Sequence, residues 1–67
     1  MAVYKKIEVV GTSPTSFADA TRVAVEEAGK TVHNMNWFEI VEQRGAIKDG
    51  KVSEFQVTVA IGFRIEH

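Results

Sequence analysis

The chain has 67 residues, a formal net charge of −1 at pH 7 and no cysteine. A chain of this length makes one domain near the lower size limit for folding on a hydrophobic core, and it has no disulfide or thiolate metal site to stabilise it. Its balanced charge gives no electrostatic case for binding nucleic acid or a membrane surface, and no apolar run approaches bilayer length. We therefore expect residues 1–67 to form a single cytoplasmic domain, of a size that often gains stability by oligomerisation.

The first element in chain order is a β-strand, predicted from Val3 to Thr12. Apolar and polar side chains alternate along this segment, as they do in a strand with one buried face. Gly11 interrupts the alternation near the end of the strand. One face of the strand is therefore expected to lie on a core.

A helix is predicted next, running to about Lys30. Its start is indicated by Ser13 with Pro14 at the first helical position, or by Thr15 a turn later, because hydroxyl groups accept hydrogen bonds from the free amides of a helix start. Val23 falls on the polar side of the helix, which hints at a contact with another chain. The apolar side of the helix is formed by Phe17, Ala20, Thr21, Ala24 and Ala28.

Two long strands complete the chain, predicted at Val32–Ile47 and Lys51–Ile65. The Asp49-Gly50 dipeptide between them favours a two-residue hairpin turn. Apolar side chains alternate without a break from Phe55 to the end of the last strand. The element order is therefore β-α-β-β, and we predict an α+β fold in which a three-stranded antiparallel sheet packs on one helix, with the first strand beside the third.

Trp37, the only tryptophan of the chain, is predicted on the sheet face that the helix does not cover. Phe38 and Ile40 take the alternate positions that point to the core, so Trp37 points away from it. A large ring on an uncovered sheet face must be covered by a neighbouring subunit or by a flat aromatic ligand. The expected hairpin register places Gly62 opposite Trp37, which leaves open space beside the indole for a stacked ring.

Strict alternation extends this register along the whole hairpin. The expected pairs are Lys48 with Lys51, Gln43 with Gln56, and Val41 with Thr58. The uncovered face then carries apolar and small side chains near Trp37 and two glutamines nearer the turn. Such a face indicates burial between subunits.

A family resemblance is carried by five segments in order, which are Lys5–Ser13, Asn36–Ile40, Gln43–Gly45, Phe55–Val57 and Gly62–Arg64. Together they span nearly the whole chain and are similar to the bacterial dodecins. The resemblance implies a hollow dodecamer of β-α-β-β subunits that binds flavins in pairs near two-fold axes. It also implies that Trp37 stacks on the isoalloxazine ring, that Gln56 hydrogen-bonds its polar edge, and that the protein stores, buffers and quenches flavin without being an enzyme.

The expected ligands are FMN, which we favour slightly, and riboflavin. No Gly-rich phosphate-binding loop is present, so an FMN phosphate would need side-chain cations. The candidates are Arg44 and Arg64, followed by Lys5 and Lys6. Strict alternation puts Arg44 on the helix side of the sheet, unless Gly45 marks a twist or bulge, whereas Arg64 shares the face of Trp37. The sequence leaves open whether coenzyme A binds as well.

The spacing of the two main ligand candidates has a further implication. Gln56 lies six positions along its strand from the residue opposite Trp37, which is roughly 20 Å at the rise of a β-strand. One flavin ring cannot span that distance. We therefore predict that the Trp37 and Gln56 of one site belong to different chains.

Two other functional classes remain open. Trp37 could be buried between the subunits of a structural shell that binds no flavin, or the chain could be a small enzyme that uses bound flavin. Glu39 shares the face of Trp37, but no base or nucleophile is positioned beside it by sequence spacing, so no catalytic residue is predicted. His33 and His67 have no second ligand at metal spacing, so no metal site is predicted.

Overall fold

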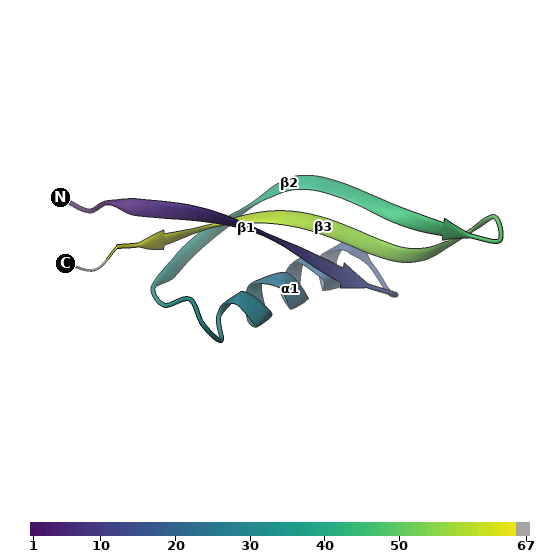
Figure 1. Ribbon diagram of the computed structural model, residues 1–67, viewed down its shortest axis with the longest axis horizontal. Helices are drawn as coiled ribbons and strands as arrows, with labels where there is room; N and C mark the ends of the chain where they lie inside the picture. The colour runs from purple at the N-terminus through teal and green to yellow at the C-terminus, as the bar shows by residue number, and fades with distance from the viewer. Residues whose placement is uncertain (66–67) are drawn as a thin grey trace.

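The computed structural model describes residues 1–65, which contain four elements. In chain order these are β1 (Tyr4–Ser13), α1 (Phe17–Ala28), β2 (Met35–Lys48) and β3 (Lys51–Arg64). The three strands form one antiparallel sheet in the order β1-β3-β2, and α1 lies against one face of it (Figure 1). The predicted β-α-β-β order, the antiparallel sheet and the pairing of the first strand with the third are confirmed.

The largest differences from the predicted boundaries lie between the helix and β2. The helix ends at Ala28 instead of near Lys30, and β2 begins at Met35 instead of Val32. In the connecting turn the amide of Val32 donates to the carbonyl of Ala28 at 2.9 Å, and Asn34 takes a left-handed conformation with a φ of 62°. The other strand boundaries lie within one residue of the predicted ones.

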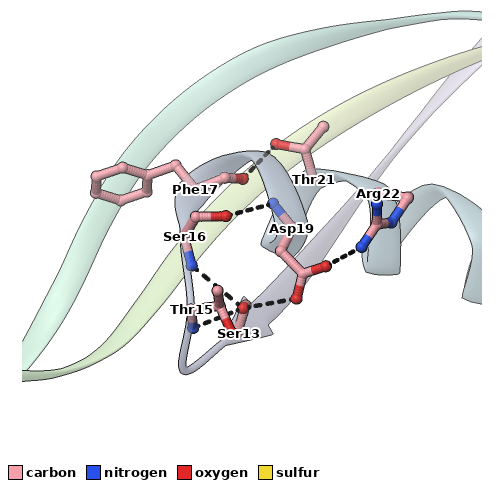
Figure 2. A network of polar contacts seen from close by, with 7 residues as sticks. All are labelled: Ser13, Thr15, Ser16, Phe17, Asp19, Thr21 and Arg22. Carbon is pink, nitrogen blue, oxygen red and sulfur yellow. Dashed lines mark hydrogen bonds and ion pairs between the residues drawn. The ribbon is translucent and has the colours of Figure 1, made fainter.

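The start of α1 is organised by two serines. The N-cap is Ser16, whose hydroxyl accepts a hydrogen bond from the amide of Asp19 at 3.0 Å, so the predicted caps Ser13 and Thr15 are wrong. Ser13 is buried, and its hydroxyl accepts from the amides of Thr15 and Ser16 at 2.9 and 3.4 Å (Figure 2). It donates to the Asp19 carboxylate at 2.8 Å, and Arg22 pairs with the other oxygen of that carboxylate. Ser13 therefore stabilises the turn that leads into the helix.

The core lies between α1 and the middle of the sheet. Its buried side chains are Ala20 and Ala24 of the helix and Val57, Val59 and Ile61 of β3. The helix approaches the sheet closely because β1 has a glycine at position 11. A Cβ on Gly11 would overlap the Ala20 carbonyl and the Ala24 side chain. Small residues on both elements therefore allow the tight packing of helix on strand.

The helix leaves much of the apolar surface of β2 uncovered. Phe38 and Ile40 lie on the helix side of the sheet, opposite the buried Ile61 and Val59, as predicted. However, they are 52% and 42% exposed, because α1 packs mainly on β1 and β3. Near the hairpin turn Ile47 is 76% exposed. Exposed apolar side chains in this number indicate a surface that contacts another molecule.

The shape of the subunit is elongated, with extents of 51 × 19 × 13 Å. The radius of gyration is 13.8 Å, against roughly 11 Å for a compact chain of the same length. The hairpin turn projects beyond α1 at one end of the molecule, and the start of β1 lies beside the end of β3 at the other (Figure 1). Within residues 1–65, no helix has the length and apolar character needed to cross a membrane.

Candidate functional site

The outer face, defined as the sheet face opposite α1, carries Trp37 directly across from Gly62, as predicted. The indole lies over this glycine, because a Cβ added at position 62 would overlap the ring atoms Cδ2, Cε2 and Cζ2 of Trp37. The predicted open space beside the indole is therefore wrong, since the ring itself fills it. The depression left by a residue without a side chain allows the flat ring to bury part of its surface on β3. Trp37 is nevertheless 40% exposed.

Two further groups flank the Trp37 ring on the outer face. The Tyr4 ring of β1 lies with its centroid 5.1 Å from the Trp37 ring, at an interplanar angle of 57°. Lys6 of β1 and Glu39 of β2 form an ion pair across β3, with 2.5 Å between Nζ and Oε1. The hydrogen bond and the charge of Lys6 lower the pKa of Glu39, and Trp37 makes the smallest contribution in the same direction. Glu39 is therefore engaged as an ionised partner of Lys6.

The middle of the hairpin has a different register from the one predicted. Glu42 lies opposite Thr58 and Arg44 lies opposite Gln56, so the predicted pairing of Gln43 with Gln56, and that of Val41 with Thr58, are wrong. An irregularity between Ile40 and Glu42 inserts one extra residue into β2. A second irregularity, between Ala46 and Ile47, restores the register, and Lys48 faces Lys51 as predicted. Between the two irregularities, the residues from Glu42 to Ala46 therefore lie on the opposite face from the one predicted.

The bulge brings Arg44 to the outer face, next to Gln56. Arg44 Nε donates a hydrogen bond to Gln56 Oε1 at 2.7 Å, and Gln56 Nε2 donates to Glu54 Oε1 at 2.9 Å. Gln43 instead faces the buried Val57 on the helix side. Strict alternation predicted Arg44 on the helix side unless a bulge intervened, and a bulge does move it to the outer face. The irregularities lie on either side of Gly45 and not at Gly45 itself. These contacts fix the orientation of the Gln56 amide.

The remaining candidate cations lie at the other end of the sheet. Arg64 faces Tyr4 on the outer face, whereas Lys5 faces Phe63 on the helix side. Arg64 and Lys5 line an open pocket there, together with residues 31–34 of the turn before β2. Lys6 is held by Glu39. The structure thus groups Arg44 with Gln56, and it leaves Arg64 near the Trp37 end.

Trp37 and Gln56 are not brought together within one chain. Gln56 lies six positions along β3 from Gly62, so the estimate of roughly 20 Å between them is unchanged. Sequence analysis missed the role of Tyr4, although its alternation with Val3 and Lys5 already placed it on the face of Lys6. It also missed Glu54, which shares the outer face with Gln56 two residues away.

Among residues 1–65, no group of three or more His, Cys, Asp or Glu side chains could hold a metal ion. His33 lines the open pocket beside Lys5. His67 lies outside the described residues.

Comparison with known proteins gives one consistent family. The family model described as Dodecin matches residues 3–66. The Dodecin of Thermus thermophilus is 45% identical over 64 residues, covering 96% of this chain and 93% of that protein. The dodecin structure from Streptomyces coelicolor matches with a TM-score of 0.95 at 44% identity, covering 98% of this chain and 94% of that one. The Calcium dodecin of Mycobacterium tuberculosis is 31% identical over 65 residues, covering 97% of this chain and 92% of that protein.

Proposed function

This chain belongs to the dodecin family of small binding proteins, and from that membership we propose that it binds FMN or riboflavin in a homo-oligomer. The arrangement of Trp37 is the observation that carries the proposal. Its indole rests on Gly62, and 40% of the residue remains exposed on a sheet face that no element of the chain covers. An electron-rich ring held in this way suits a flat, electron-poor partner.

The residues on the outer face fit the two parts of a flavin ring. Stacking of the isoalloxazine on Trp37 is worth about 1–3 kcal/mol if base–aromatic stacking is a guide. Gln56 uses one acceptor lone pair for Arg44 and one N–H for Glu54. An amide has two of each, so Gln56 keeps one donor and one acceptor for the polar edge of the ring.

We place the Trp37 and the Gln56 of one site on different subunits, because their separation within a chain exceeds the length of the ring. The need for an assembly is supported by the elongated shape and by the exposed apolar side chains of β2. Two flavins stacked between indoles related by a two-fold axis would exclude water from both rings. The number of twelve subunits is proposed from the family resemblance alone.

The biological role that we propose is storage and buffering of flavin, with quenching of its photochemistry. A bound flavin absorbs light, and an indole in stacking contact offers rapid electron transfer that would shorten the excited state. Paired and stacked rings leave little room for a substrate, so an enzymatic role ranks last. A shell that buries Trp37 without any ligand is the main alternative, and coenzyme A is not part of this proposal.

A fluorescence titration tests the proposed function. FMN and riboflavin are each titrated with purified protein while flavin emission is followed. Strong saturable quenching with either flavin is the expected result. A protein that quenches neither flavin and stays colourless would leave the ligand-free shell as the better description.

A mixing experiment tests whether each site is built from two chains. Trp37→Ala and Gln56→Ala chains are co-expressed in equal amounts, and high-affinity flavin sites are counted. Half of the randomly formed pairs would contain one chain of each kind, and each such pair would regain one of its two sites, so about one quarter of the wild-type capacity is expected. If both side chains come from the same chain, mixing restores no sites.

Arg44 is our candidate for the phosphate of FMN, because it lies beside Gln56 and still has free guanidinium N–H groups. Arg44→Met is expected to weaken FMN binding about fivefold, which corresponds to ~1 kcal/mol for an exposed charged contact, and to change riboflavin binding less. Arg22→Met, on the helix, is the matched control. An equal loss for both flavins would instead assign Arg44 to the orientation of Gln56.

A further inference from the structure

The Trp37 ring lies on small residues of the outer face. Lys6 of β1, Gly62 of β3 and Trp37 of β2 stand in one row across the sheet, and the ring lies over the glycine. In the next row Glu39 stands opposite Ala60, which is 4% exposed. The indole therefore rests on a strand whose outer side chains are small at this point.

The ring is also flanked on two sides. The strand register places Tyr4 one row from Gly62 toward the start of β1, and its ring contacts the indole. The ion pair between Lys6 and Glu39 crosses β3 on the opposite side, between the rows of Gly62 and Ala60. The indole is thus bounded below by a glycine, on one side by an aromatic ring, and on the other by an ion pair.

We infer that Gly62, Tyr4 and the ion pair of Lys6 with Glu39 are positioning residues, which hold the Trp37 ring flat on β3, with its outer side free, before a ligand arrives. This inference rests on the proposed flavin function. A ring that is already held loses less conformational freedom on binding, and side-chain ordering at an interface corresponds to about 2- to 10-fold in affinity. The positioning residues act through Trp37 and need no contact with the ligand.

The ion pair makes the position of the indole sensitive to acid. Because Lys6 lowers the pKa of Glu39, the pair is complete above the ordinary pKa of glutamate, about 4.3, and is lost as the pH falls through the lowered value. The ion pair therefore restrains the Trp37 ring to the same extent throughout the neutral pH range, and this restraint is lost only in acid. By the strand register, the other charged side chains nearest to this pair on the outer face are Glu8 of β1, Glu42 of β2 and Arg64 of β3.

The single tryptophan makes the test direct, because near-ultraviolet circular dichroism and intrinsic fluorescence report Trp37 without other indoles. Glu39→Gln breaks the ion pair and keeps the side-chain size. Glu27→Gln is the matched control, because it breaks the exposed pair between Glu27 at the end of α1 and Lys30 in the turn that follows. Riboflavin is the ligand, since it carries no phosphate that the charge change would affect.

We expect Glu39→Gln to reduce the Trp37 dichroism of the free protein and to weaken riboflavin binding about 2- to 10-fold, with Glu27→Gln unchanged in both. The wild-type dichroism should change as the pH falls below the ordinary pKa of glutamate, and Glu39→Gln should lack this transition. Gly62→Ala should lift the ring and weaken binding in the same way.

Two outcomes would overturn the inference: an unchanged Trp37 signal in Glu39→Gln, or an altered signal with unchanged riboflavin affinity. The second would mean that the ring is held but that its position does not matter for binding. Failure of the proposed function is separate, because the wild-type protein would then not bind riboflavin at all. The dichroism of the ligand-free variants would still show whether the ion pair holds the ring.

Discussion

Trp37→Ala is expected to weaken the binding of both flavins by about 5- to 150-fold, which corresponds to the ~1–3 kcal/mol of one aromatic stacking contact. The exposed part of the indole supplies the contact area, and no other tryptophan can replace it. The measurement is the fluorescence titration with FMN and riboflavin, repeated on the variant. The residual affinity reports what the hydrogen bonds contribute without stacking.

The control for Trp37→Ala is the oligomeric state of the variant, measured by light scattering. An assembled variant that no longer quenches flavin would show that the site lies at an interface which does not depend on the indole. Trp37→Phe keeps a ring on Gly62 and should lose less affinity than the alanine variant. Dissociation of Trp37→Ala into smaller species would show that the indole is mainly structural, and undiminished quenching would place the flavin elsewhere.

Ile61→Ala is expected to lower the free energy of unfolding by about 2–5 kcal/mol. Ile61 is 1% exposed and belongs to the buried cluster between β3 and α1, so its truncation leaves a cavity in the core. Domains of this size have little stability to lose, and the variant should unfold at a much lower urea concentration. Circular dichroism of the backbone during a urea titration measures the change.

Ile47→Ala is the matched comparison, because Ile47 is 76% exposed within the subunit. If a neighbouring subunit covers it, its loss should appear as a stronger dependence of stability on protein concentration. Ile61→Ala should lower stability at every concentration. Equal and concentration-independent effects of the two substitutions would contradict the assignment of Ile61 to the core and of Ile47 to an interface.

The fold and the face of Trp37 were predictable because they depend on regular patterns. The unbroken alternation of β3 determines which side chains meet the helix, and the short turn at Asp49 and Gly50 sets the start of the hairpin register. These two features predicted the pairing of Trp37 with Gly62, which is correct because the two irregularities between the turn and Trp37 compensate each other. The β-α-β-β order follows from the same patterns.

The strand register in the middle of the hairpin was not predictable from the sequence. An inserted residue cannot be recognised in an alternating pattern when the residues on both sides of it are compatible with either face of the sheet. Val41 is the extra residue of β2, and a valine in a strand gives no sign of a bulge. The error exchanged Gln43 and Arg44 between faces. The cap of α1 was missed for a related reason, since four hydroxyl residues precede Phe17 and their sequence order does not show which one reaches the amide of Asp19.

In the proposed flavin site, the separation of Trp37 from Gln56 along β3 also determines how many ligands an assembly can hold. Each subunit would supply one indole half-site and one amide half-site, and neither could be completed by its own chain. In an arrangement closed by symmetry every half-site finds its complement, so the number of complete sites equals the number of chains. An open arrangement leaves incomplete half-sites at its ends. A ratio of one ligand per chain therefore requires a closed assembly and is not a property of the single subunit.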